Sequence, residues 1–538
     1  MVCVSREDGP QSPLTPLGGF PREEGVPNQI SPLHPHFPER SAAMANHMKA
    51  GPSPPRRKLC RSGLVVTAAL LFLFVGMWLY VFSTGLVPGL YLGLGCVLSC
   101  LLCAGVFFLT WDVSHRIRRV AGYILAAILA AACLVGSLAL WRAVHTVRQI
   151  SDTEVERSTV AFYVEQDSTY ESLDELEGNE LGILAELDRS STDETLQQTE
   201  TQYGMSFATR EYASLSQLAD ALRGGEVACI LLNQAFLSLY EETPGYEEFP
   251  AELREISAQE VEHPITGTTA EQPEAEAASE EISIENPVVT VLISGSDTRG
   301  SVIDQRGRSD VNIIARVNRE THEILLVSTP RDYYVPLALS GNPYDKLTHA
   351  GIYGMDVLLG TLENLYDTEI DYYFRINFTG FTEIIDALGG IDVSSEYEFT
   401  AGGHDYHVGT NHLDGEEALS FARERYSFTE GDRQRGENQM AVIEGVLEKA
   451  LSPSILTGYL DILESVEDCV DTSIPYDLIA ELVRQQVSEN ASWNIESFSV
   501  DGSDSSASTY SMAQELYVML PDEATVQTAK EKLAALAA

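Results

Sequence analysis

The second half of the chain contains short stretches of Asp, Arg and Gly of the kind that bind phosphate groups. The first, GSDTRG at residues 295–300, directly follows the apolar run 287–294. Glycine lets backbone N–H groups approach a phosphate, Arg299 offers a planar fork of donors, and Asp297 offers a carboxylate for a metal ion. The stretch indicates an anion site beside a cation, and an ordinary turn is the alternative.

A second stretch, Arg308-Ser309-Asp310, enters the next predicted strand. Because Asp297 and Asp310 lie at the facing ends of two consecutive strands, a hairpin-like path would bring the two carboxylates together. Two carboxylates and the oxygens of a bound phosphate suit Mg²⁺, which keeps several waters and rarely has a complete protein cage. The sequence predicts a Mg²⁺ site here. A surface Arg–Asp pair, which contributes little to stability, is the alternative.

A third stretch, Pro330-Arg331-Asp332, follows the predicted strand Glu323–Val327. Arg331 is therefore expected at the same edge of the sheet as Asp297. Lys346 and His349 come shortly afterwards in the run KLTHA. His349 is a candidate proton carrier, and a purely structural histidine is the alternative.

The fourth stretch supplies a cluster of arginines followed by a glutamine. Arg435 and Gln439 are four residues apart, so they share one face of a helix, and Ile443 continues that face. Polar side chains at the head of an apolar stripe need a partner, which a bound anion would provide. Arginine binds phosphate through two parallel N–H groups, which favours an anion site. An Arg–Glu network is the alternative. The residues of interest in this stretch are Arg423, Arg425, Arg435 and Gln439.

These stretches lie between strand-like and helix-like segments. Apolar or alternating runs at 311–317, 371–378 and 391–393 predict strands, and Asp414 with Glu417 predicts a helix start close to a capping box. Strands interspersed with helices indicate a layered α/β domain with a mixed sheet.

The N-terminal part predicts membrane attachment. Three apolar spans, roughly 63–82, 86–109 and 120–141, are each long enough to cross a bilayer as a helix. Basic clusters precede the first span and separate the second from the third, which puts both clusters in the cytoplasm. Residues 151–538 are then expected outside the cell. A hairpin plus one buried helix is the alternative.

Charge and cysteine content narrow the function further. Residues 151–538 carry 21 Lys and Arg against 74 Asp and Glu, a net charge of −53. Such a surface repels nucleic acid, so we expect no nucleic-acid partner, and any anionic substrate needs a local cluster of cations. Of eight cysteines only Cys229 and Cys469 lie in this part. They are far apart in sequence, so neither a disulfide framework nor a metal-binding pair is predicted.

Taken in order, the motifs of residues 287–455 resemble the LytR-CpsA-Psr family. The motifs are GSDTRG, RSD, PRD, KLTHA, DYYFRINFTGFTEIIDALGGIDV, HLDGEEALSFARER and GDRQRGENQ. Members of the family attach teichoic acids, capsular polysaccharides or similar glycopolymers to peptidoglycan, and some decorate proteins. Their domain also has an older description as a transcriptional attenuator. The sequence departs from the family pattern at Gln434 and Asn438, which puts the local loop shape in doubt.

The resemblance implies roles for individual residues. Asp297 and Asp310 match aspartates linked to Mg²⁺, and Asp297, Arg331, Arg423 and Arg425 are the expected catalytic residues. Seven residues match positions around the substrate pyrophosphate: Arg299, Arg308, Arg331, Arg423, Arg425, Arg435 and Gln439.

The resemblance also implies the fold class, which is α/β. Three N-terminal transmembrane helices precede an extracellular accessory α/β domain and an α/β/α sandwich catalytic domain with a mixed sheet and an apolar tunnel for a polyprenyl chain. The expected division is a disordered cytoplasmic tail (1–61), transmembrane helices (62–150), the accessory domain (151–260), an acidic linker (261–286), the catalytic domain (287–455) and its C-terminal extension (456–538).

The implied function is a cell-envelope glycopolymer ligase in the cell membrane. It would transfer a phosphoryl-linked glycan from a polyprenyl pyrophosphate carrier to peptidoglycan, at the C6 hydroxyl of N-acetylmuramic acid. Its partners would be the lipid-linked glycan, the peptidoglycan acceptor and the lipid bilayer. Asp297 or Asp310 would be the general base, and His349 a weaker candidate. A polyprenyl pyrophosphate hydrolase and a non-catalytic envelope sensor or attenuator are the alternatives.

Overall fold

The structure is a computed structural model. It describes residues 60–111, 113, 115–151, 155–264, 286–296, 303, 306–429, 431–452 and 469–536. The predicted tail, the predicted acidic linker, and both Asp297 and Arg299 lie outside the described residues.

Three long apolar helices confirm the three predicted spans. They are α1 Arg61–Ser83, α2 Gly89–Thr110 and α3 Arg116–Ser151, and each is long and apolar enough to cross a membrane. The third helix is longer than the apolar run that predicted it, because polar residues up to Ser151 continue the same helix.

Residues 155–264 form a five-stranded sheet in the order β3-β2-β4-β1-β5. The sheet is mixed, since β1 pairs antiparallel with β4 and β5 while β2 pairs parallel with β3 and β4. Its strands are β1 Val155–Glu165, β2 Glu180–Leu184, β3 Ala208–Tyr212, β4 Cys229–Asn233 and β5 Leu253–Pro264. The helices are η1 Leu173–Leu176, α4 Arg189–Tyr203, α5 Leu215–Arg223, η2 Gln234–Phe236, α6 Leu237–Glu241 and α7 Phe249–Glu252.

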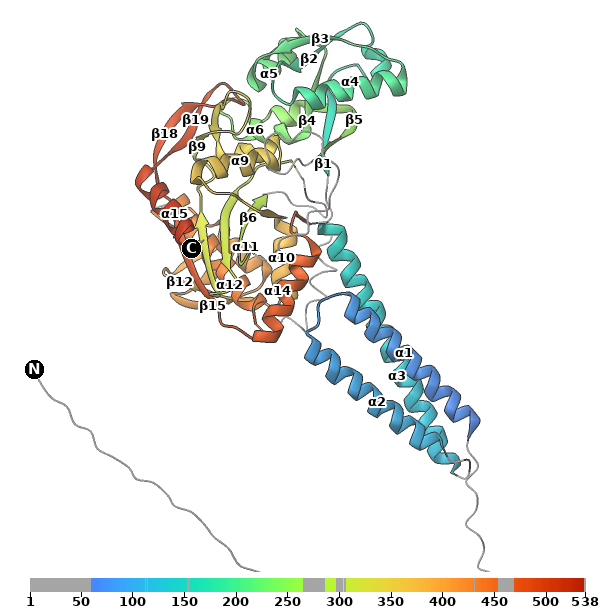
Figure 1. Cartoon of the computed structure of the whole chain (residues 1–538). Coiled ribbons are helices and arrows are strands. Elements are labelled where there is room, and N and C mark those ends of the chain that lie inside the picture. Colours follow the sequence, from blue (N-terminus) through green and yellow to red (C-terminus); the bar gives the residue numbers. More distant parts are fainter. Residues whose placement is uncertain are drawn as a thin grey trace, which may run out of the picture. The chain divides into compact units, whose positions relative to one another are not determined.

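A second, six-stranded sheet has the order β16-β11-β6-β7-β8-β17. Its strand β6 is labelled in Figure 1. It is also mixed: β6, β7 and β8 pair antiparallel, whereas β11 lies parallel to β6 and β17 lies parallel to β8. The strands are β6 Val288–Ser296, β7 Val311–Asn318, β8 Glu323–Ser328, β11 Tyr372–Asn377, β16 Val470–Thr472 and β17 Asn494–Ser499. Both edge strands thus come from the chain beyond residue 455.

Helices cover both faces of this second sheet. Ile314 and Leu325 pack in one apolar cluster with α9 and α15, and Ile313 and Leu326 pack in another with Met440 of α12. Successive side chains of a strand point to opposite faces, so neighbouring residues serve different layers. The predicted α/β/α sandwich with a mixed sheet is confirmed.

Besides the six strands of this sheet, residues 286–536 form helices, α9, α12 and α15 among them, and further strands. The helices are α8 Leu347–Tyr353, α9 Met355–Tyr366, α10 Phe378–Ala387, α11 Gly415–Arg423, α12 Asp432–Ala450, α14 Tyr476–Glu489 and α15 Glu523–Leu536. The strands are β9 Tyr334–Pro336, β10 Tyr344–Lys346, β12 Ile391–Ser395, β13 Phe399–Ala401, β14 His404–Tyr406, β15 Gly409–Leu413, β18 Gly502–Ser508 and β19 Glu515–Pro521.

The predicted capping box fixes the start of α11, the helix that ends at Arg423. The Asp414 carboxylate accepts from the Glu417 backbone N–H at 2.9 Å, and the Glu417 carboxylate accepts from the Asp414 N–H at 3.0 Å. Two backbone donors that the helix cannot satisfy are thereby paired.

We predict that Asp414→Ala destabilises the protein by about 1 kcal/mol, the usual cost of losing such a cap. Thermal unfolding of the detergent-solubilised chain would show a lower midpoint. Glu416→Ala is the matched control, because Glu416 is exposed in the same helical turn and takes no part in the box. An equal effect of the two substitutions would contradict the role of the cap.

Candidate functional site

Antiparallel pairing brings the connection from β6 to β7 and the segment after β8 to the same ends of the strands of the second sheet, which we call the loop edge. Gly295, near the end of β6, pairs with Val311 at the start of β7, and Ile313 of β7 pairs with Ser328 at the end of β8. The backbone N–H of Asp310 donates to the carbonyl of Gly295 at 2.8 Å. Residues before β7 and after β8 therefore meet there, as the sequence predicts for Asp310 and Arg331.

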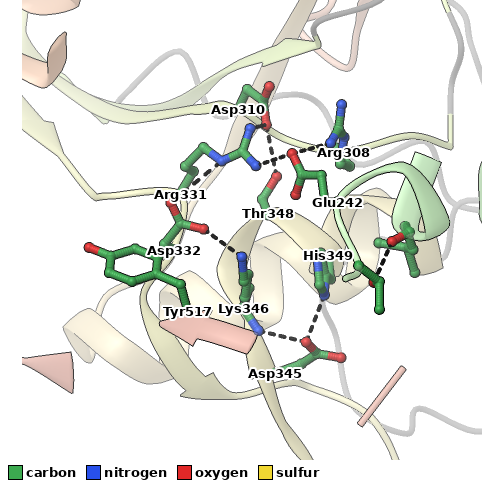
Figure 2. Close-up of polar contacts among 12 residues, drawn as sticks. Glu242, Arg308, Asp310, Arg331, Asp332, Asp345, Lys346, Thr348, His349 and Tyr517 are labelled. Atoms are coloured by element: carbon green, nitrogen blue, oxygen red, sulfur yellow. Dashed lines mark hydrogen bonds and ion pairs between the residues drawn. The ribbon is translucent and has the colours of Figure 1, made fainter. Parts of the chain in front are cut away.

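Arg331 is the centre of the resulting polar network (Figure 2). Its Nη1 donates to Oδ1 of Asp310 at 2.7 Å, and its Nη2 donates to Oε1 of Glu242 at 2.5 Å. Thr348 also donates to Oδ1 of Asp310, at 3.0 Å. Burial alone would lower the pKa of Arg331, but Asp310 and Glu242 favour its charged form and the pKa is raised.

Glu242 is the unexpected member of this network, because it follows α6 of the first sheet's domain. The same carboxylate oxygen that accepts from Arg331 also pairs with Arg308. Burial would raise the pKa of Glu242, but Arg331 and Arg308 lower it to about 2. No sequence pattern distinguishes Glu242, which is one acid among many in this region.

Lys346 and Asp332 extend the network on the far side of Arg331. Lys346 Nζ lies 3.0 Å from Oδ1 of Asp332, whose other oxygen lies 3.7 Å from Nε of Arg331. Three cations and three carboxylates thus share one buried cluster, which we call the Arg331 cluster: Arg308, Arg331, Lys346, Glu242, Asp310 and Asp332.

His349 lies close to this cluster but is occupied by a structural contact. The ring is 1% exposed, and its Nδ1 lies 2.7 Å from Oδ1 of the fully buried Asp345. The Asp345 carboxylate also accepts from the backbone N–H groups of Ser511 and Lys346. Burial would raise the pKa of Asp345, but His349 and these hydrogen bonds lower it. His349 is therefore better explained as a structural residue than as a proton carrier.

An apolar cavity adjoins this edge of the sheet. Its lining includes Gly295 and Val311, which flank Asp310 in the paired strands. Arg423 and Gln439 contribute polar groups to the same lining, and the Arg423 guanidinium lies 4.6 Å from the centre of the Phe378 ring. The other lining residues are Ile293, Ser296, Ile376, Asn377, Phe378, Phe381, Leu419, Ala422, Val442 and Ile443.

Two of the predicted arginines have other surroundings. Arg425 donates to the hydroxyl of Tyr426 at 2.6 Å and lies over that exposed ring. Arg435 lies in the first turn of α12, where its backbone N–H donates to Gly431. The structure thus joins Arg308, Asp310 and Arg331 in one network and places Arg423 and Gln439 on one cavity. The assignment of all these residues to a pyrophosphate stays a prediction.

The two departures from the family pattern lie together inside α12. Gln434 donates to Asn438 at 3.2 Å, and Asn438 donates to the carbonyl of Phe421 in α11 at 3.2 Å. Both side chains are more buried than Arg435 and Gln439, because α12 packs against α11 and β12 as well as against the sheet. A hydrogen bond from Gln434 to Asn438 thus links the two residues that depart from the family pattern.

The described residues fit a bound Mg²⁺ only in part. Asp310 is a carboxylate at the loop edge, and Mg²⁺ is commonly held by one or two carboxylates with substrate phosphates and waters. Asp297, the second predicted ligand, lies outside the described residues. Within the described residues there is no group of three or more His, Cys, Asp or Glu side chains that would hold a metal alone. The Mg²⁺ site therefore stays a prediction.

Comparison with known proteins gives a family match and several relatives. The family model of the LytR_cpsA_psr family matches residues 258–534. A Bacillus cereus protein named polyisoprenyl-teichoic acid–peptidoglycan teichoic acid transferase TagU is 39% identical over 199 residues, which is 37% of this chain and 64% of that protein. An Enterococcus faecalis protein of the same name is 39% identical over 35% of this chain and 62% of its own. The chain thus spans somewhat less than two thirds of the length of these relatives.

A solved structure is also similar to part of this chain. The crystal structure of B. subtilis TagV matches with a TM-score of 0.40 and 26% identity, covering 47% of this chain and 98% of that one. The chain thus contains an α/β/α sandwich with an ionic cluster at the loop edge and an apolar cavity beside it. The family match covers more than half of the chain, and the protein belongs to the LytR_cpsA_psr family.

We predict that His349→Ala lowers the free energy of unfolding by roughly 3 kcal/mol, since it leaves the buried Asp345 carboxylate without the ring that hydrogen-bonds to it. Activity per folded molecule should be retained. Thermal unfolding would measure the loss of stability, and the reaction rate per folded molecule would measure the activity. The variant His349→Asn should recover part of the stability. A large loss of rate at unchanged stability would restore His349 as a proton carrier.

Proposed function

We propose that this protein transfers a phosphoryl-linked glycan from a polyprenyl pyrophosphate carrier to peptidoglycan. The observation that carries the proposal is the contact of the Arg331 cluster with the loop edge from which the apolar cavity extends. A lipid pyrophosphate has the matching two parts: an anionic head and an apolar chain. The names of the relatives, which describe transfer of teichoic acid from a polyisoprenyl carrier to peptidoglycan, support this reading.

In the proposed reaction the arginines neutralise charge. An acceptor hydroxyl attacks the phosphorus on the glycan side of the pyrophosphate, and the bond from that phosphorus to the bridging oxygen breaks. Polyprenyl phosphate leaves with the electron pair, and a phosphodiester joins glycan and acceptor. Fixed cations aimed at the charge that develops are usually the dominant contribution in phosphoryl transfer. Arg308, Arg331 and Arg423 are proposed to supply them, with Arg299, Arg425, Arg435 and Gln439 completing the set.

The reaction also needs a group that takes the proton of the acceptor hydroxyl and residues that hold the metal ion. Asp297 or Asp310 is the proposed proton acceptor, and both are proposed ligands of Mg²⁺, which when bound would neutralise phosphate charge. The proposed acceptor is the C6 hydroxyl of N-acetylmuramic acid. No covalent intermediate with the enzyme is required, because the acceptor attacks the phosphorus directly.

The proposed localisation is the cell membrane, with residues 151–538 outside. The three membrane-length helices and the basic clusters at the predicted cytoplasmic ends support this orientation. A membrane-impermeant maleimide applied to intact cells should label Ser503→Cys, at an exposed position of β18. Ser53→Cys, in the predicted cytoplasmic tail, should be labelled only after permeabilisation. The reverse pattern would show that the orientation is wrong.

Arg331→Ala should abolish transfer while leaving the fold intact, because it removes the charge at the centre of the cluster. The assay combines the full chain in detergent with Mg²⁺, a short-chain polyprenyl pyrophosphoryl oligosaccharide and peptidoglycan fragments. Mass spectrometry would detect the glycan–phosphate–muramic acid adduct. Arg210→Ala is the control, because Arg210 is an exposed arginine paired with Glu226 in the first sheet.

Each outcome of this assay has a definite meaning. Adduct formation by the wild type and the control alone would support the transferase. Retained transfer in Arg331→Ala would contradict the role of the cluster. Free glycan phosphate without adduct would point to a hydrolase, and unchanged lipid that still binds would point to a binding protein.

A further inference from the structure

The carboxylate of Glu242 occupies the guanidinium groups that the proposed function assigns to pyrophosphate. One oxygen of Glu242 pairs with both Arg308 and Arg331, and the other fork nitrogen of Arg331 is held by Asp310 (Figure 2). Arginine binds phosphate through such a fork of parallel N–H groups. A phosphate group that binds Arg331 in this way must therefore replace one of its two carboxylate partners.

Glu242 is the partner that comes from outside the sandwich. Asp310 directly precedes β7 of the sandwich and also accepts from Thr348, so it belongs to the local framework of the loop edge. Glu242 instead follows α6, and its contact with Arg331 joins residues 89 positions apart. The residues 155–264 thus reach into the candidate site of the family domain through one side chain.

A continuous apolar core holds Glu242 at this position. Tyr240, two residues earlier, is fully buried and donates to the carbonyl of Leu215 at 2.8 Å. The same core cluster includes Ile352 and Met512 of the family domain, and Ser216 donates to the carbonyl of Met512 at 2.7 Å. The backbone near Glu242 is held by these contacts, whereas its side chain is 27% exposed and is therefore not enclosed on every side.

The contact of Glu242 with Arg308 and Arg331 determines the net charge of the Arg331 cluster. With Glu242 in place, three carboxylates offset three cations, so the cluster is neutral. Rotation of Glu242 away leaves a net positive charge for an anionic ligand. The lowered pKa of Glu242, caused by Arg331 and Arg308 against the effect of burial, keeps its carboxylate ionised at neutral pH.

We propose that Glu242 is a built-in competitor of the substrate, a carboxylate that binds Arg308 and Arg331 where a phosphate of the lipid pyrophosphate binds. The competition sets the affinity of the site for every pyrophosphate ligand. This inference rests on the proposed function, because it takes the Arg331 cluster as the pyrophosphate site.

The test compares dissociation constants for inorganic pyrophosphate and geranyl pyrophosphate. Isothermal titration calorimetry would use the full chain in detergent with Mg²⁺, as wild type, Glu242→Gln and Glu241→Gln. Glutamine keeps the size and one acceptor oxygen of Glu242 but removes its charge. We expect Glu242→Gln to bind both ligands roughly tenfold more tightly or better, given the strength of hydrogen bonds to charged groups.

The gain should be equal for the two ligands. Both must displace the same carboxylate, and Glu242 does not line the apolar cavity. Glu241→Gln should bind like the wild type, because Glu241 is the exposed neighbour in the same turn. Thermal unfolding of each variant would show that the fold is retained.

Two results separate this inference from the proposed function. Unchanged or weaker binding in Glu242→Gln, with binding lost in Arg331→Ala, would overturn the competitor role alone and make Glu242 a positioning residue. Unchanged pyrophosphate binding in Arg331→Ala would instead overturn the site itself. In the Arg331→Ala background the gain from Glu242→Gln should shrink, because paired residues do not act additively.

Discussion

Antiparallel pairing of β6, β7 and β8 determines which loops of this protein can meet. Because β7 runs antiparallel to both β6 and β8, the start of β7 and the end of β8 lie at the same loop edge. Asp310 before β7 and Arg331 after β8 therefore lie within hydrogen-bonding distance. The cavity shares this edge through Gly295 and Val311. The ionic cluster and the apolar cavity are therefore adjacent as a consequence of strand order, whatever the ligand is.

A second constraint is the cost of burying charge. Arg331 has a side chain only 13% exposed, and an isolated guanidinium at such a depth is strongly unfavourable. In a chain with 80 acidic residues, carboxylates are abundant, and the Arg331 cluster uses three of them. The same carboxylates that make burial tolerable reduce the positive charge available to an anion. Stability and anion binding thus make opposite demands on one set of residues.

Features set by local spacing and strand order could be predicted from the sequence, whereas contacts between segments far apart in the chain could not. The meeting of Asp310 with Arg331 and the Asp414 capping box follow from strand order and local spacing. Glu242 reaches Arg331 across two domains, and no periodic pattern distinguishes it from nearby acids. The edge strands β16 and β17 of the second sheet come from remote parts of the chain, and pairing between remote segments leaves no local signal. Roles read from the family motifs for Arg425 and Arg435 stay predictions.

The two parts of the proposed substrate contribute differently to binding. Displacing Glu242 from two arginines costs about 1.5–3 kcal/mol for each charge-assisted hydrogen bond that is lost and not replaced. Burying one methylene group of a lipid gains about 0.8 kcal/mol, so a few isoprenoid carbons in the apolar cavity offset that cost. A free phosphate has no such gain, although it meets the same carboxylate. On these terms the cavity beside the cluster, lined by Phe378 and Leu419, would allow the proposed lipid-linked substrate to occupy arginines that the protein pairs with its own acid.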